Sequence, residues 1–184
     1  MNGTIEIKTK RLLLRRYGGG DAAVLYEKFG RDPKMFEYSG WNPYATKAMA
    51  EETVADFIRH YSEPRFYGWA VDDGSGLVGT VGAYDYDPEK SQIEVGMSIA
   101  WDAWGKGFAT EALTAVLHHL TGHEQIRTVT AWCAADNIGS KRAMEKAGMQ
   151  LKSTESGALA IGGNQFDKLV FAYTAPAEKE KEQR

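Results

Sequence analysis

The stretch that most constrains the fold is Trp104–Thr110, with the sequence Trp-Gly-Lys-Gly-Phe-Ala-Thr. It follows a strand-like run, Gln92–Ile99, and precedes an amphipathic helical pattern, Phe108–Leu120. Glycine lets the backbone approach a ligand closely, and the first N–H groups of a helix have no intrahelical partner. Such a turn can hold phosphate groups at the positive end of the helix dipole. The sequence therefore predicts an anion-binding turn at a strand–helix junction.

Two common phosphate-binding motifs do not fit this turn. A dinucleotide fingerprint would require a third glycine where Thr110 stands, and an acidic residue about 20 residues further on. A P-loop requires Gly-x-x-x-x-Gly-Lys-Ser/Thr, which the chain lacks. A plain strand–helix connection without a ligand is the remaining alternative, so other segments must indicate the ligand.

Hydrophobic periodicity predicts an α/β fold with a mixed, mostly antiparallel sheet of about seven strands and about four helices. Strands Gln92–Ile99 and Arg127–Cys133 are joined by a helix, so we expect them to be parallel. The glycine turn then lies at the carboxyl end of the first of them, where α/β folds bind ligands. The other expected strands are Thr9–Tyr17, Phe66–Val71, Leu77–Tyr84, Met149–Ser156 and Gln165–Thr174. The other expected helices are Ala22–Phe29 after an Asp21 cap, Thr46 to Tyr61, and Asn137 or Ser140 to Ala147.

Length and composition limit the classes of protein. The 184 residues favour one domain, which we expect over residues 1–174, with a charged, disordered tail over 175–184. A formal net charge of −3 gives no indication of a nucleic-acid partner. A single cysteine, Cys133, excludes an intramolecular disulfide and favours a reducing, cytoplasmic location. No leader pattern opens the chain and no apolar run approaches the roughly 18 residues of a membrane span, so no membrane partner is expected. Both a monomer and a homodimer fit the sequence.

A second motif, Asn137 to Met149, follows the strand Arg127–Cys133. Asn137 and Ser140 can each cap the following helix, which is a purely structural role. Alternatively, both side chains point into a cleft between the two parallel strands. Four cations against Glu145 would suit phosphate groups there: Lys141, Arg142, Lys146 and Lys152.

Three segments together resemble the GNAT superfamily of acetyl-CoA-dependent N-acetyltransferases, and within it the branch of Rim-type ribosomal-protein N-terminal acetyltransferases. They are Thr9–Arg16, Trp104–Leu113 and Asn137–Gly148, and the resemblance covers about residues 8–174. The pyrophosphate pattern of the family, Gln/Arg-x-x-Gly-x-Gly/Ala, falls on Trp104, Gly107 and Ala109. Tryptophan removes a side-chain donor there but leaves the backbone N–H groups.

The resemblance implies direct acetyl transfer within a ternary complex. The two parallel strands would splay apart and hold pantetheine in the gap. An N–H of Met97 or Ser98 would polarise the thioester carbonyl, and Asn137 would hydrogen-bond the pantetheine arm. The implied acetyl-CoA contacts are Met97, Ser98, Trp104, Gly105, Lys106, Gly107, Phe108, Ala109, Thr110, Asn137, Ser140 and Lys141.

Two catalytic residues are expected from the same resemblance. The acceptor amine must be neutral to attack, and Glu94 is the candidate base because the family often has an acidic residue at this position. Strand alternation places Glu94 opposite Ile93 and Val95, so it is only a surface carboxylate if that face meets solvent. Many GNAT enzymes use a tyrosine where this chain has Met144, which leaves Ser140 as the nearest candidate acid for the thiolate.

The acceptor is a primary amine in this interpretation, either a protein N-terminus or a small molecule such as an antibiotic, a polyamine or an amino acid. Aromatic residues that could wall its pocket are Trp41, Tyr44, Tyr84 and Tyr86, and an acidic rim over residues 72–94 would attract a cation. A non-catalytic acyl-CoA-binding regulator is a further alternative. The four histidines lack partners at metal-ligand spacing, so we expect no metal.

Overall fold

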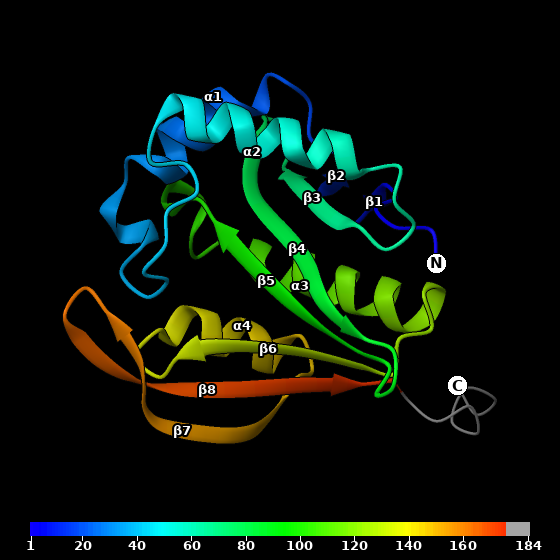
Figure 1. Ribbon diagram of the computed structural model, residues 1–184, viewed down its shortest axis with the longest axis vertical. Coiled ribbons are helices and arrows are strands. Elements are labelled where there is room, and N and C mark those ends of the chain that lie inside the picture. Colours follow the sequence, from blue (N-terminus) through cyan, green and yellow to red (C-terminus); the bar gives the residue numbers. More distant parts are fainter. Residues whose placement is uncertain (176–184) are drawn as a thin grey trace.

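The computed structural model describes residues 1–175, whose strands form one eight-stranded sheet (Figure 1). Apart from Ala175, the expected tail lies outside the described residues. The strands are β1 (Ile7–Lys8), β2 (Leu13–Arg15), β3 (Tyr67–Asp72), β4 (Leu77–Asp87), β5 (Gln92–Ile99), β6 (Thr128–Ala134), β7 (Gln150–Ile161) and β8 (Asn164–Thr174). Their spatial order is β1-β2-β3-β4-β5-β6-β8-β7, and every neighbouring pair is antiparallel except β5 with β6. The predicted mixed sheet with one parallel pair is confirmed.

Helices cover both faces of this sheet. They are α1 (Asp21–Leu25), α2 (Lys47–His60), α3 (Phe108–His118) and α4 (Ile138–Lys146). On one face, Leu25 and Val54 of α1 and α2 belong to a buried cluster with Ala70 of β3. On the other face, α3 and α4 join a larger cluster with Ile93 and Val129. The two layers bury side chains from both sides of the central strands, which holds the middle of the sheet rigid.

The β5–β6 junction is open at one end. Only Gln92–Glu94 and Thr128–Thr130 are paired across it. Beyond Glu94 and Thr130 the strands diverge, and Figure 1 shows the wedge between them. The predicted parallel, splayed pair is therefore confirmed.

The first expected strand, Thr9–Tyr17, was too long: the chain reverses over Thr9–Leu12, and only Leu13–Arg15 forms a strand. The Thr9 backbone N–H donates to the Leu12 carbonyl at 2.9 Å, which closes a turn between β1 and β2. Thr9 Oγ1 accepts from the Leu12 N–H as well, at 2.9 Å. The sheet gains its eighth strand from this hairpin, whose tip carries Lys10 and Arg11.

Two helix starts differ in their capping. Thr46 Oγ1 accepts from the Met49 N–H at 3.1 Å, which confirms the predicted cap of α2. Ala50 and Val54 are the buried residues of α2, whereas Met49 is 40% exposed. Asp21 does not cap α1, because its carboxylate accepts from Gly18 and from Arg15 instead.

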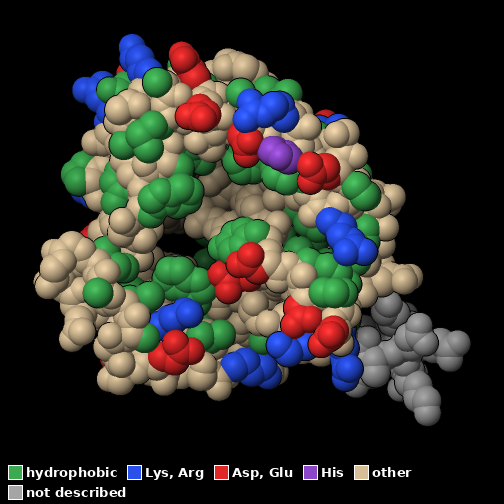
Figure 2. Space-filling model, viewed as in Figure 1, with side chains coloured by type: hydrophobic (Ala, Val, Ile, Leu, Met, Phe, Trp, Pro, Cys, Tyr) green, Lys and Arg blue, Asp and Glu red, His purple; other side chains and the backbone are tan. Residues whose placement is uncertain are grey.

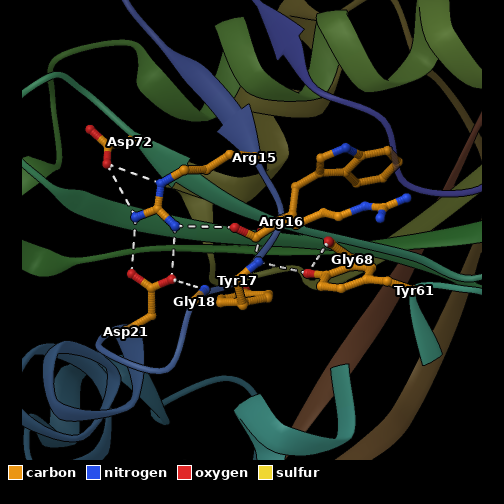
Figure 3. A network of polar contacts seen from close by, with 9 residues as sticks. Arg15, Arg16, Tyr17, Gly18, Asp21, Tyr61, Gly68 and Asp72 are labelled. Atoms are coloured by element: carbon orange, nitrogen blue, oxygen red, sulfur yellow. Dashed lines mark hydrogen bonds and ion pairs between the residues drawn. The ribbon is translucent and has the colours of Figure 1, made fainter. Parts of the chain in front are cut away.

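Arg15 links three elements through paired hydrogen bonds (Figure 3). Its guanidinium lies 2.8 Å from Asp21 of α1 and 3.2 Å from Asp72 of β3. Burial alone would raise the pKa of Asp21, but the bonds from Arg15 and from the Gly18 N–H lower it below its usual value. The charge network therefore fixes α1 against the sheet at neutral pH.

We expect Arg15→Met to lower the free energy of unfolding by about 2 kcal/mol at pH 7, since two partly buried carboxylates lose their cation. Urea denaturation measures this loss. The difference from wild type should shrink below a pH of about 4. A lowered carboxyl pKa contributes stability above its unfolded-state value, and this contribution is lost as the pH falls through the folded-state value.

Arg59→Met is the matched control for this experiment. Arg59 lies 2.8 Å from Asp56, but these side chains are 60% and 52% exposed. An exposed pair contributes little, so we expect a change within about 0.5 kcal/mol. Equal losses in the two variants would contradict a special role for the Arg15 network.

Candidate active site

A cavity of about 870 Å³ lies where β5 and β6 diverge. Its floor comes from residues 95–99 of β5 and 132–134 of β6, and the glycine turn and the start of α4 also line it. Residues 34–44, between α1 and α2, form its other wall. Figure 2 shows the molecule hollowed between the α1–α2 side and the β6–β8 side, with hydrophobic side chains around the hollow. The cavity therefore brings together both motifs of the sequence.

The backbone of β5 offers unpaired polar groups to this cavity. The backbone N–H of Ala100, directly after β5, donates to the Val78 carbonyl of β4 at 2.8 Å. Because N–H directions alternate along a strand, the Ser98 N–H also faces β4, and the Met97 N–H faces the gap. Between the two expected oxyanion donors, the geometry therefore favours Met97.

The glycine turn presents a second set of donors. Gly105 and Gly107 have φ of +75° and +80°, a left-handed conformation that suits glycine. Within residues 1–175, the backbone N–H groups of residues 105–110 have no hydrogen-bond acceptor. The Trp104 indole N–H donates to Ile99 O at 2.6 Å, so this side chain closes the end of β5 and is unavailable as a phosphate donor. The turn can thus bind an anion through its backbone alone.

The start of α4 also lines the cavity. Asn137 Oδ1 accepts from the Ser140 N–H at 3.1 Å, so Asn137 does cap the helix. Its Nδ2 group is the part of the side chain left for a ligand. Both Asn137 and Ser140 line the cavity. Cys133 is buried and also lines the cavity, where burial raises the pKa of its thiol against the opposing effect of the Ser140 hydroxyl.

The structure places the Glu94 carboxylate beside the cavity and behind two aromatic side chains. Trp132 Nε1 donates to Glu94 Oε1 at 3.0 Å, and Tyr84 is the cross-strand partner of Glu94. Trp132 and Tyr84 line the cavity, whereas Glu94 is not among its lining residues. Burial, followed by the negative charge of Glu94, raises the pKa of Tyr84 to about 12. Tyr84 is therefore a neutral hydroxyl at neutral pH, next to a carboxylate.

Because residue 96 is a glycine, the Tyr84 hydroxyl can lie over the backbone of β5. A Cβ at Gly96 would lie 2.7 Å from Tyr84 Oη. The phenol therefore lies across β5, one residue before the gap-facing Met97 N–H. A larger residue at position 96 would displace it.

The four aromatic residues expected at the acceptor do not stay together. Trp41, Tyr44 and Tyr84 line the cavity. Tyr86 packs against the core on the α3 side, with Arg65 over its ring at 5.2 Å. The reason is a bulge at Asp85, whose φ is +56° and which shifts the register of β4. The expected contact by Tyr86 is therefore corrected.

Most residues of the expected acidic rim form ion pairs or hydrogen bonds outside the cavity. Asp72 binds Arg15, Asp73 accepts hydrogen bonds from Ser75, and Asp87 pairs with Lys90 at 3.0 Å. The carboxylates that do line the cavity are those of Glu37 and Asp136.

Several expected acetyl-CoA contacts lie outside the cavity lining, namely Lys106, Thr110 and Lys141. The Lys106 carbonyl instead accepts from Arg11, and its amine lies 5.9 Å from the Phe108 ring centroid. Thr110 belongs to the first turn of α3, so its backbone N–H can still bind an anion.

Within the described residues no group of three potential metal ligands occurs, and no helix has both the length and the apolar character to cross a bilayer.

Sequence reasoning missed the wall formed by residues 34–39 and the contribution of Trp132. The alternation of β6 puts Trp132 opposite the buried Cys133, which could have indicated that it shares a face with Glu94. Tyr38 had no such signal, because its place depends on the packing of its ring against Phe166 of β8 at 5.6 Å between centroids.

The donor set fits acetyl-CoA. A ligand in which a pyrophosphate joins the nucleotide to an arm with two amide groups needs anion donors beside a line of unpaired backbone groups. The turn at residues 105–110 supplies the first, while β5 beyond Glu94 and the Asn137 amide supply the second.

Comparisons with known proteins agree with this geometry. The family model described as the acetyltransferase (GNAT) domain matches residues 11–150. The uncharacterised N-acetyltransferase YoaA of Bacillus subtilis is 25% identical over 174 residues, which cover 94% of this chain and 98% of YoaA.

Solved structures share the fold. A GNAT-family acetyltransferase from Bacillus anthracis has a TM-score of 0.79 at 23% identity, over 92% of this chain and 98% of that one. RimL, a ribosomal L7/L12 alpha-N-protein acetyltransferase in complex with coenzyme A, has a TM-score of 0.83 at 17% identity, over 92% of this chain and 98% of RimL. The predicted GNAT fold with Rim-type neighbours is confirmed. Since the family match spans most of the chain, the protein belongs to the GNAT family of acetyltransferases, and its relatives YoaA and YnaD of Bacillus subtilis are N-acetyltransferases by name.

Proposed function

We propose that the protein transfers the acetyl group of acetyl-CoA directly to a primary amine, with the α-amine of a protein N-terminus as the first candidate. The observation that carries this proposal is the single cavity in which the unpaired edge of β5 meets the donor-rich turn at the start of α3. A Rim-type neighbour named for N-terminal acetylation supports the choice of acceptor.

Each part of the cavity has a separate proposed role. The N–H groups of residues 105–110 bind the pyrophosphate, and Asn137 Nδ2 holds the pantetheine arm. The Met97 N–H polarises the thioester carbonyl, which typically contributes about 3–4 kcal/mol to the transition state. Acetyl-CoA supplies an activated acyl group with a thiolate leaving group, and Ser140 is the nearest hydroxyl on α4 to protonate that thiolate.

Tyr84 connects the amine to Glu94. An ammonium N–H gives its proton to the Tyr84 oxygen while the Tyr84 O–H gives its proton to Glu94. Tyr84 ends neutral, the amine ends neutral and Glu94 ends protonated. An α-amine with a pKa near 7.7–8.0 needs less help than a lysine amine near 10.4, which favours the N-terminal acceptor.

A small-molecule amine is the second candidate. The aromatic side chains of Trp41, Tyr44 and Tyr84, together with the carboxylate of Glu37, would suit a compact cation in the same cavity. A cytoplasmic location fits both candidates, because acetyl-CoA must be available and the sole cysteine is free.

Coenzyme A release with a panel of acceptors tests the proposal. One set contains peptides with different N-terminal residues, and the other contains polyamines, amino acids and aminoglycosides. Turnover with free N-terminal peptides, but with neither acetyl-blocked peptides nor small amines, supports the first candidate. Turnover with small amines alone selects the second candidate. Tight acetyl-CoA binding without turnover on any amine would instead identify a non-catalytic acyl-CoA-binding regulator.

A further inference from the structure

The tip of the β1–β2 hairpin is bonded to the first turn of α3, about 100 residues away in the chain. Glu111 of α3 accepts from Thr9 Oγ1 at 2.6 Å and from the Arg11 N–H at 2.8 Å. The other Glu111 oxygen lies 2.7 Å from both Nε and Nη2 of Arg11. Burial opposes ionisation of Glu111, but these bonds lower its pKa, so it is charged at neutral pH. The carboxylate therefore fixes the plane of the Arg11 guanidinium.

The remaining arm of that guanidinium holds the glycine turn. Arg11 Nη1 donates to the Lys106 carbonyl at 2.8 Å. In a trans peptide unit the C=O and the following N–H point in opposite directions. Because Arg11 holds the Lys106 carbonyl, the Gly107 N–H points away from Arg11. It faces the opposite side of the turn, which Arg11 does not cover.

Two further contacts surround the same turn. Arg11 Nη2 is 3.4 Å from the position that a Cβ would take at Gly107, and Arg11 Cζ is 4.9 Å from the Phe108 ring centroid. The side chain thus contacts Lys106 and Phe108 and lies beside Gly107 between them. A turn with two left-handed glycines is flexible by itself, and ordering it during binding would weaken the affinity.

We propose that Arg11 is a positioning residue for acetyl-CoA, which holds the Lys106 carbonyl so that the N–H groups of residues 107–110 are arranged for the pyrophosphate before it binds. Glu111 acts through Arg11, and Thr9 acts through Glu111. This inference rests on the proposed function, because it requires that the turn bind the pyrophosphate. It explains why the Thr9–Arg16 segment and the Trp104–Leu113 segment occur together in one chain.

Ligand truncation tests the inference. Calorimetry gives the Kd of coenzyme A, which carries the pyrophosphate, and of pantetheine, which lacks it. We expect Arg11→Ala to weaken coenzyme A binding about tenfold and to leave pantetheine binding within about twofold of wild type. In kinetics, KM for acetyl-CoA should rise in the same proportion while kcat is kept, and kcat/KM for acetyl-pantetheine should not change.

Two more variants separate geometry from charge. Arg11→Lys keeps the charge, but one ammonium cannot reproduce the planar contacts to both Glu111 and Lys106, so it should lose affinity for coenzyme A as well. Lys10→Ala removes the neighbouring exposed cation of the hairpin tip, for which the described residues show no ion pair, and should behave as wild type.

Each other outcome overturns the inference. Equal weakening of coenzyme A and pantetheine by Arg11→Ala would show a general structural role. Full affinity in Arg11→Lys would show that charge alone matters, and full affinity in Arg11→Ala would show no role. If wild type itself binds coenzyme A no better than pantetheine, the proposed function fails first, and the inference fails with it.

Discussion

Replacing Gly107 with valine should abolish coenzyme A binding at concentrations that saturate the wild type. Gly107 has a φ of +80°, which a β-branched residue adopts only with strain, and its N–H is one of the proposed pyrophosphate donors. Relaxing that strain rotates the peptide units on both sides and turns the donors away from the anion. Losing two charge-assisted hydrogen bonds of about 1.5 kcal/mol each corresponds to a loss of affinity of about 100-fold.

Gly74→Val is the matched control for this variant. Gly74 has a φ of +89° in the β3–β4 turn, and a Cβ there would meet nothing within 4 Å. It therefore introduces a similar backbone strain at a residue outside the cavity lining. Both variants should lose comparable stability in thermal unfolding, and only Gly107→Val should lose coenzyme A binding by calorimetry. A Gly107→Val protein that binds coenzyme A normally would show that the pyrophosphate lies elsewhere.

Replacing Glu94 with glutamine should lower kcat about 100-fold at a pH below the pKa of the acceptor amine. Glutamine can still accept the Trp132 N–H with its oxygen, so the packing of the indole is kept. It cannot take up the proton that leaves the amine. The deficit should narrow as the pH rises through the amine pKa, about 7.7–8.0 for an α-amine, because an increasing fraction of the acceptor arrives already neutral.

Tyr84→Phe identifies the route of the proton. If Tyr84 passes the proton to Glu94, then Tyr84→Phe, Glu94→Gln and the double variant should show similar losses of kcat and similar pH profiles, because the two residues act as one unit. Glu89→Gln, in the exposed β4–β5 turn, is the control and should match wild type. An unchanged pH–rate profile in Glu94→Gln would remove Glu94 from the mechanism. A loss in Glu94→Gln without one in Tyr84→Phe would instead indicate a water in place of the phenol.

The two motifs predicted which backbone segments line the cavity, because local hydrogen bonds and glycine conformations define those segments. Glycines at positions 105 and 107 and a helix immediately afterwards define a donor-rich turn whatever surrounds it. Asn137 likewise caps α4 through an atom three residues away. Such local hydrogen bonds are encoded within a few residues, so a single sequence reveals them.

The aromatic wall of the cavity was predicted less well, because contacts between distant segments build it. Tyr84 and Tyr86 look equivalent in sequence, yet the bulge at Asp85 sends them to opposite faces of the sheet. Tyr38 reaches the cavity wall only because Phe166 packs against it. No local sequence pattern predicts the bulge at Asp85 or the position of Tyr38.

The amino-acid sequence by itself determined the order of the elements, the parallel pair at β5 and β6, and the turn that should hold the pyrophosphate, since each depends on periodicity or on short-range hydrogen bonds. The tertiary structure alone decided that Glu94 lies behind Tyr84 and Trp132, that Met97 faces the gap, and that Arg11 holds the Lys106 carbonyl. These three facts depend on strand register and on side chains that meet from segments far apart in the chain. Contacts of this kind depend on the packing of the whole domain, so local secondary-structure propensity does not predict them.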